Sequence, residues 1–230
     1  MLIYSFVYNE KEDKTMAFFG SFKKSAAELK DVRCLVVTAL LIALDLAIKS
    51  ITITIMPDLK VSFAFLAKAS IGMLYGPTVG FIAGTISDIV SFAIKPTGTF
   101  SPLFTLVEAT GAMLYGLFLY KLKISRTELR DKSLQKQNVK QIIRIVLAKL
   151  SVVVVCNLIL TPLALVVTNS MEAGTLVFGS VLLKYPARLL KNAIQFPVDC
   201  VMLIGVLPII ASAYNIVFKG NNRSFRKETE

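Results

Sequence analysis

LVVTALLIALDLAIKSITITI, from Leu35 to Ile55, is the first long apolar run of the sequence. A helix needs about 20 residues to cross the hydrocarbon of a bilayer, so this run predicts one membrane crossing. Asp45 and Lys49 interrupt the run, and charged side chains at membrane depth usually face an interior cavity or each other. The run therefore predicts a membrane helix whose charges point into a bundle.

The rest of the chain continues this pattern. Of its 230 residues, 55% are hydrophobic, and the mean hydropathy is +0.67, whereas soluble domains are nearer 45–50% apolar. Five further apolar runs follow: Val61–Tyr75, Val79–Ile94, Leu103–Tyr120, Ile145–Val167 and Ala187–Val217. We therefore expect an all-α integral membrane protein, a bundle of six transmembrane helices. Pro197 and Pro208 should kink or break the last helix.

The distribution of positive charge predicts how this bundle is oriented. The net charge is +11, and the linker from Lys121 to Arg144 alone holds eight Lys and Arg residues against two acids. Cytoplasmic loops carry such an excess of cations. With six crossings this linker shares one side with both ends of the chain, whereas five crossings would separate the two basic ends. We expect a cytoplasmic segment 1–33, a membrane domain 34–218 with the cytoplasmic linker 121–144, and a cytoplasmic tail 219–230.

Some charges do not fit this positive-inside pattern, and they fall toward the predicted outer half. Lys68, Arg188 and Lys191, together with Asp45 and Glu108, are best interpreted as the lining of an outward-facing polar cavity. For Lys49, Lys95 and Lys184 taken alone, a side chain that reaches the headgroups or an internal ion pair is the better interpretation. A cavity with surplus positive charge suits an anionic ligand, which arginine grips through paired hydrogen bonds. An acid in the same cavity could accept N–H donors from a heterocycle.

Small residues form two stripes at helical spacing. Ala39, Ala43 and Ala47 recur every four residues in the first apolar run, and Gly80 and Gly84 do so in the third. Such stripes let helices approach closely. Spacing alone leaves two alternatives open, which are packing within the bundle and docking on another membrane subunit.

Catalytic and metal-binding patterns are missing from the sequence. It contains no histidine, which is the commonest general base and metal ligand at neutral pH. Its three cysteines lie in or beside apolar runs without metal-ligand spacing, and no nucleophile elbow or phosphate-binding loop occurs. The start of the chain lacks the pattern of a cleavable signal peptide. We expect no enzyme, no metal, no cofactor and no nucleic-acid partner.

Several stretches, taken in order, resemble the substrate-binding S components of energy-coupling factor (ECF) vitamin transporters, in particular the folate family. They are Leu74-Tyr75-Gly76-Pro77-Thr78-Val79-Gly80 leading to Ser87-Asp88-Ile89, then Lys95-Pro96-Thr97-Gly98-Thr99-Phe100, then Leu114-Tyr115-Gly116-Leu117-Phe118-Leu119-Tyr120-Lys121, and Pro186-Ala187-Arg188-Leu189-Leu190-Lys191-Asn192. The resemblance as a whole covers roughly residues 30 to 218.

The resemblance implies a six-helix subunit of the bacterial plasma membrane that captures a vitamin at the outer face. The partners it implies are membrane lipid, a coupling transmembrane subunit and two ATP-binding subunits, which hydrolyse the ATP. It makes Ala39 and Ala43 part of a docking surface. With the resemblance, the candidate substrate site comprises Asp45, Lys49, Lys68, Lys95, Thr97, Gly98, Phe100, Glu108, Arg188 and Lys191.

The sequence departs from the family pattern at positions of the presumed vitamin-binding pocket. Members of the folate family are typically uncharged where this chain has Asp45, Lys68 and Glu108. These charges either tune folate recognition or indicate another anionic vitamin, such as pantothenate. Two alternatives outside the family remain: a stand-alone secondary transporter, which would use the intramembrane charges, and an assembly or sensor subunit, which would need only the alanine stripe.

Overall fold

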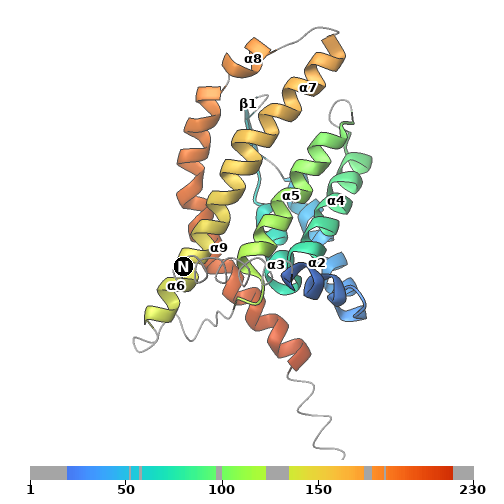
Figure 1. Cartoon of the computed structure of the whole chain (residues 1–230), viewed down its shortest axis with the longest axis vertical. Coiled ribbons are helices and arrows are strands. Elements are labelled where there is room, and N and C mark those ends of the chain that lie inside the picture. The colour runs from blue at the N-terminus through green and yellow to red at the C-terminus, as the bar shows by residue number, and fades with distance from the viewer. Residues whose placement is uncertain are drawn as a thin grey trace, which may run out of the picture.

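The structure is a computed structural model, and it describes residues 20–51, 53–56, 59–96, 100–122, 135–173, 178–183 and 185–219. A short helix over residues 20–28 comes first. The elements that follow are α2 (Val32–Ser50), β1 (Ile53–Met56), β2 (Leu59–Val61), α3 (Phe65–Tyr75), α4 (Pro77–Ile94), α5 (Pro102–Leu119), α6 (Gln135–Val152), η3 (Val153–Leu160), α7 (Thr161–Ala173), α8 (Phe178–Leu183) and α9 (Tyr185–Lys219) (Figure 1).

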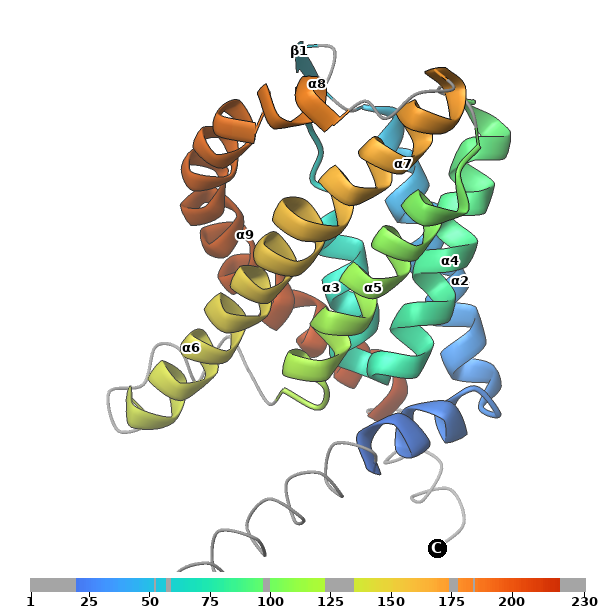
Figure 2. The ribbon, with the colours of Figure 1, turned by 45° about the horizontal axis from the view of Figure 1, so that its top comes forward.

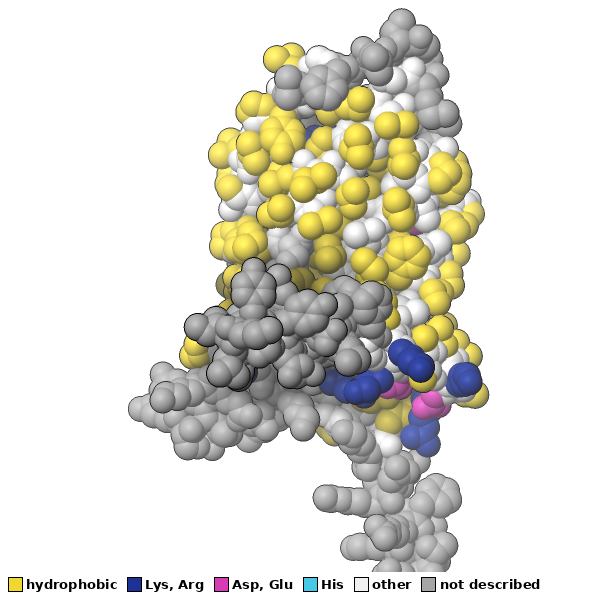
Figure 3. All heavy atoms as spheres, in the orientation of Figure 1, with side chains coloured by type: hydrophobic (Ala, Val, Ile, Leu, Met, Phe, Trp, Pro, Cys, Tyr) yellow, Lys and Arg dark blue, Asp and Glu magenta, His cyan; other side chains and the backbone are white. Residues whose placement is uncertain are grey.

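The surface of the bundle is that of a membrane protein. Four helical segments in the described part of the chain are long and apolar enough to cross a bilayer: Pro77–Ile94, Pro102–Leu119, Val139–Ser170 and Tyr185–Phe218. On the face drawn in Figure 3, hydrophobic side chains cover the wall of the bundle, and charged side chains gather at one end. A band of apolar surface with charge at its edge is what a lipid environment requires.

The described part of the chain is helical apart from one short β-hairpin, which follows the first long helix. β1 and β2 pair antiparallel, with Ile53 opposite Val61 and Thr54 opposite Lys60. The first helix therefore ends at Ser50 rather than Ile55, and the second begins at Phe65 rather than Val61. The reason is local, because the alternating Ile and Thr residues after Ser50 are β-branched and fit a strand better than a helix.

Glycines set the contact between α4 and α5. A Cβ added to Gly80 would lie 2.7 Å from the carbonyl oxygen of Ala112, and one added to Gly84 would lie 2.9 Å from the Cα of Ala109. Both glycines are buried in this contact. Of the two alternatives that spacing left open for Gly80 and Gly84, the structure places both glycines in close packing within the bundle.

The Gly76-Pro77 pair joins α3 to α4, as the sequence predicted. Gly76 has a φ of +88°, a conformation that favours glycine, and Pro77 begins α4. Buried Ser25, from the helix over residues 20–28, donates to the carbonyl of Tyr75 (2.6 Å) and accepts from the backbone N–H groups of Thr78 (3.0 Å) and Val79 (3.1 Å). The helix over residues 20–28 is thereby tied to this turn and satisfies the free N–H groups at the start of α4.

The second half of the chain consists of two long helical paths. α6, η3 and α7 follow one another without a break, with a stretch of π-helix in the middle. α9 is also continuous, and its axis changes direction along its length (Figure 1). Of the two outcomes expected from Pro197 and Pro208, the helix bends and does not break. Proline is tolerated inside membrane helices because neighbouring groups can satisfy the freed carbonyls. Figure 2 shows α3 and α5 between α9 on one side and α2 and α4 on the other.

Candidate functional site

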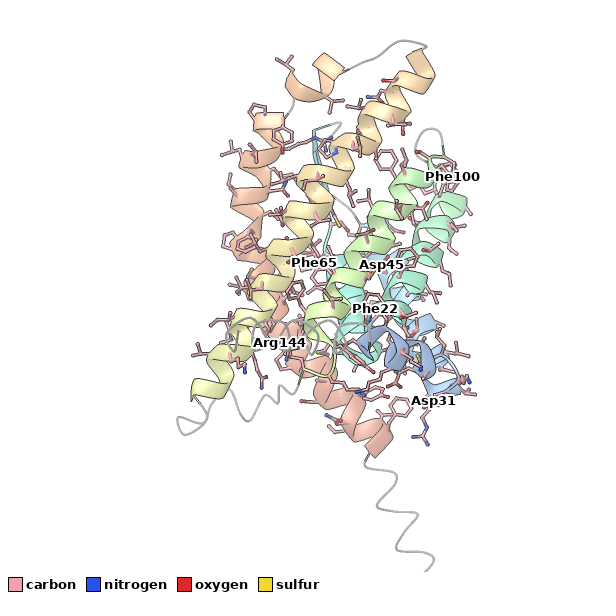
Figure 4. The ribbon with its side chains drawn as sticks, viewed as in Figure 1. Phe22, Asp31, Asp45, Phe65, Phe100 and Arg144 are labelled. Carbon is pink, nitrogen blue, oxygen red and sulfur yellow. The ribbon has the colours of Figure 1, made fainter. Side chains whose placement is uncertain are left out.

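A cavity of about 360 Å³ lies between the two halves of the bundle. Its walls come from the end of α2, the start of α3, one face of α5, the α6–η3–α7 path and the first turns of α9. The charged and polar residues that line it are Lys49, Ser62, Lys68, Glu108, Tyr115, Lys149, Asn157, Thr161, Lys191, Asn192 and Gln195. Figure 4 shows Asp45 and Phe65 near the middle of the bundle, whereas Phe100 lies at one end and Arg144 and Asp31 at the other.

One wall of the cavity carries a network of paired charges. Lys49 lies 3.2 Å from the carboxylate of Asp45, one helical turn earlier on α2, and 3.9 Å from that of Glu108 on α5. Lys68 of α3 forms an ion pair with the same Glu108. Ser87 of α4 donates a hydrogen bond to Asp45, which is buried. Two lysines from different helices thus converge on Glu108, and Lys49 forms an ion pair with Asp45 as well.

The opposite wall carries a second ion pair. Lys149 on α6 lies 2.7 Å from Asp199 on α9, and its ammonium group is 4.3 Å from the centre of the Phe65 ring. Gln195, one turn before Asp199 on α9, donates to that carboxylate at 3.5 Å. The sequence analysis did not select Lys149 or Asp199, although both are charges inside apolar runs, and that signal would have found them.

Amide side chains occupy the space beside this pair. Asn157 in η3 donates to Asn192 on α9 at 3.0 Å, and Gln195 lines the cavity one turn further along α9. Cys156 and Thr161 both face the cavity, and the Thr161 hydroxyl donates to the Cys156 carbonyl at 2.7 Å. Donor and acceptor residues are five positions apart in a π-helix as well, and π-helical segments are common at functional sites. Nothing in the sequence indicated the amides, because neutral polar residues do not stand out in an apolar run.

The predicted substrate residues separate into two groups. Lys49, Lys68, Glu108 and Lys191 line the cavity, and Asp45 lies directly behind Lys49. The other residues are not brought to the cavity lining: Arg188, Lys95 and Phe100, while Thr97 and Gly98 lie outside the described residues.

Three of the predicted substrate residues, Arg188, Lys95 and Phe100, lie outside the lining of this cavity. Arg188 is one turn before Lys191 on α9 and is half-buried; it is not among the residues that line the cavity, and its Nε is buried without a hydrogen-bond partner among the residues that the structure describes. Lys95 follows the last turn of α4 and is exposed. Phe100 is exposed and packs against the ring of Phe92 at 5.1 Å. Helical spacing shows which residues share a face, but the rotation of a helix against its neighbours decides what that face meets.

The charge of the lining favours an anion. Four lysines face the cavity, Lys49, Lys68, Lys149 and Lys191, against the single carboxylate of Glu108. Even with Asp45 and Asp199 counted behind them, the lysines are in excess. Charges in a partly dry site interact more strongly than in water, so this lining suits a ligand that carries carboxylates.

The alanine stripe lies on a different surface. Ala39, Ala43 and Ala47 are exposed on α2, beside the exposed side chains of Val36 and Leu40. Asp45 and Leu41 face the interior from the other side of the same helix. α2 thus presents one face to the bundle and a smooth, small-residue face to its surroundings.

Comparison with known proteins identifies relatives. The family model described as ECF-type riboflavin transporter, S component, matches residues 30–193. The folate transporter FolT of Clostridium novyi (strain NT) is 27% identical over 182 residues, which cover 79% of this chain and 92% of that protein. FolT of Streptococcus mutans serotype c is 41% identical over 98 residues, covering 42% of this chain and 53% of the relative.

A solved structure agrees with these relatives. The crystal structure of FolT bound with folic acid is similar to this chain with a TM-score of 0.58 at 27% sequence identity, covering 75% of this chain and 91% of that one. The resemblance stated from the sequence motifs is confirmed.

Proposed function

This chain belongs to the family of ECF-type riboflavin transporter S components, and from that membership we propose that it is the subunit that captures folate for an ECF transporter. The family consists of transporter subunits rather than enzymes, and its members are multi-pass proteins of the cell membrane. The single observation that carries the choice of ligand is the lysine-rich cavity.

Folate differs in charge from riboflavin, the vitamin named in the description of the family. Riboflavin is uncharged, whereas folate ends in a glutamate with two carboxylates. Four lysines around one Glu108 suit carboxylates and would be costly to desolvate beside a neutral ligand. The FolT relatives and the folic acid in the similar structure support the same choice.

The orientation of folate in the cavity follows from the same charges. Its carboxylates bind Lys49, Lys68 and Lys191. Asp45 holds Lys49 in place, whereas Glu108 competes with the ligand for Lys68 and Lys49. The amides of Asn157, Asn192 and Gln195 face the ring system and the amide of the ligand. Lys95, Thr97, Gly98 and Phe100 remain predicted contributors to the substrate site.

The topology proposed here has six crossings with both ends of the chain in the cytoplasm. It adds α2 and the short α3 to the four long apolar segments. The boundaries are those expected from charge: a cytoplasmic segment 1–33, a membrane domain 34–218 with the cytoplasmic linker 121–144, and a tail 219–230. The cavity then faces outward, since the basic linker and both ends lie on the other side.

Uptake requires partners in this proposal. The exposed face of α2 around Ala39 and Ala43 docks on a coupling transmembrane subunit. Two ATP-binding subunits supply the energy, because the sequence has no phosphate-binding loop of its own.

Calorimetry on the purified protein tests the proposal. Folate should bind tightly without ATP, and riboflavin should bind weakly or not at all. Tight binding of pantothenate alone would keep the family and the anion site but replace the vitamin. Failure to bind any B vitamin would overturn the proposal. Uptake by the chain alone in proteoliposomes, abolished by an ionophore, would favour a secondary transporter instead.

A further inference from the structure

The hydroxyl of Tyr115 is a polar group inside the cavity that the proposed charge contacts leave unused. Tyr115 is 1% exposed and lines the cavity. Its hydroxyl is buried and has no hydrogen-bond partner among the residues that the structure describes. Other buried hydroxyls of the bundle differ in this respect, since that of Ser25 makes three hydrogen bonds and that of Ser70 makes one.

The position of Tyr115 on α5 explains how a ligand reaches it. Glu108, Gly111 and Tyr115 all line the cavity and follow one another at spacings of three and four residues, along one face of the helix. Seven residues separate Glu108 from Tyr115, which is about 10 Å along the helix axis. Gly111 between them has no side chain, so the cavity stays open along this face of α5.

The surroundings of Tyr115 are apolar. It belongs to a core cluster with Ala69, Met73, Cys156 and Leu203. In such a place a phenylalanine would pack as well, and a hydroxyl without a partner costs about 1–3 kcal/mol. A buried tyrosine hydroxyl usually finds a partner, and the cavity is the side from which one can come.

We infer that Tyr115 is a ligand-binding residue whose hydroxyl makes a hydrogen bond to the uncharged end of the bound vitamin, about two helical turns along α5 from the lysines that hold its carboxylates. The inference rests on the proposed function, because it assigns a further contact in the same cavity. A ligand that touches both places must carry an anionic end and, about 10 Å away, a polar but uncharged group. The mostly apolar neighbours of Tyr115 and the nearby carboxylate of Asp199 disfavour an anionic group at this depth.

Replacing Tyr115 by phenylalanine tests this assignment, because the change removes only the hydroxyl. Folate titrated into purified Tyr115→Phe protein should bind about tenfold more weakly than to the wild type, as one hydrogen bond is lost. Thermal unfolding without ligand should occur at the same or a higher temperature, since no protein hydrogen bond is lost. A hydroxyl with only a structural role would give the reverse, a lower unfolding temperature and unchanged affinity.

Tyr75→Phe is the matched control. Tyr75 is as deeply buried but its hydroxyl donates to the backbone carbonyl of Arg33, and the residue is not part of the cavity lining. This variant should keep the affinity for folate and lose some thermal stability. Unchanged affinity in Tyr115→Phe would overturn the assignment alone, including the case in which a water molecule satisfies the hydroxyl. Failure of the wild type to bind any vitamin would overturn the proposed function together with this assignment.

Discussion

Lys149 on α6 and Asp199 on α9 form an ion pair of 2.7 Å inside the bundle, with only 6% and 2% of their side chains exposed. The pair joins the two long helical paths of the second half of the chain, beside the cavity. Buried charges of this kind depend on each other, because each would be left in a poorly solvated place without its partner.

Breaking this pair by Asp199→Asn should therefore destabilise the protein by about 3–5 kcal/mol, since the ammonium group of Lys149 loses its counter-charge. Thermal unfolding measured by circular dichroism in detergent tests this. The double variant Lys149→Met with Asp199→Leu should recover most of the loss, because no buried charge remains unpaired. A single variant as stable as the wild type would contradict the structural importance of the pair.

Lys191 and Arg188 should behave differently, although they are one turn apart. Lys191→Met removes a cation from the cavity lining, and losing one partner of a semi-buried charge contact costs about 2–5 kcal/mol in folate binding. Arg188→Met should change affinity much less, because Arg188 is not among the lining residues. Calorimetry of both variants checks this, and equal losses would show that Arg188 reaches the ligand.

Glu108→Gln should strengthen the binding of an anionic vitamin. Its carboxylate pairs with Lys68 and lies 3.9 Å from Lys49, so it competes with a ligand carboxylate for both lysines. Two unit charges about 4 Å apart attract by about 4 kcal/mol at an effective dielectric constant of 20, so even partial relief is measurable by calorimetry. Weaker binding would instead show that Glu108 accepts N–H donors from the ligand.

A bulky residue on the exposed face of α2 should strongly reduce folate uptake without weakening folate binding. Ala39→Trp or Ala43→Trp should leave folate affinity unchanged, because both alanines face away from the cavity. Uptake in cells that contain the coupling subunits should fall strongly, because the small-residue stripe no longer permits close approach. Val201→Trp is the control, since Val201 is 70% exposed on α9 and lies away from this face. Normal uptake by the alanine variants would disprove docking through α2.

Gly116 and Gly111 provide a matched pair on α5. A Cβ at Gly116 would lie 2.6 Å from the backbone of Gly76 and Pro77, whereas one at Gly111 would lie 3.6 Å from the Cys156 sulfur. Gly116→Ala should cost about 1–3 kcal/mol of stability by overpacking, and Gly111→Ala should be nearly neutral. Thermal unfolding of the two variants measures this difference in stability, and equal stability would contradict the close packing of helices at Gly116.

The membrane class and much of the site were predictable from the sequence. Apolar runs of spanning length are required by the thickness of the bilayer, and that signal needs no knowledge of packing. Charges inside such runs are expensive unless they face a cavity or a partner, so Lys49, Lys68, Glu108 and Lys191 could be selected in advance. Ordered motifs around Gly76 and Gly116 identified the family before any comparison.

Other features depend on how the helices are rotated and paired. Glycine stripes and alanine stripes look alike in a sequence, yet Gly80 and Gly84 are buried against α5 while Ala39 and Ala43 face outward. The role of the neutral amides and of the Tyr115 hydroxyl could be recognised only from the structure, in which seven separate helical elements enclose one cavity.

The sequence by itself therefore determined the environment of each segment: which segments lie in the lipid, and which charged side chains cannot face the lipid. The tertiary structure decided which residues meet: that Lys68 pairs with Glu108, that Lys149 pairs with Asp199, and that Lys191 lines the cavity while Arg188 does not. The physical reason is that hydropathy is a property of each segment alone, whereas a contact depends on the relative rotation of two helices, set by close packing between residues far apart in the chain.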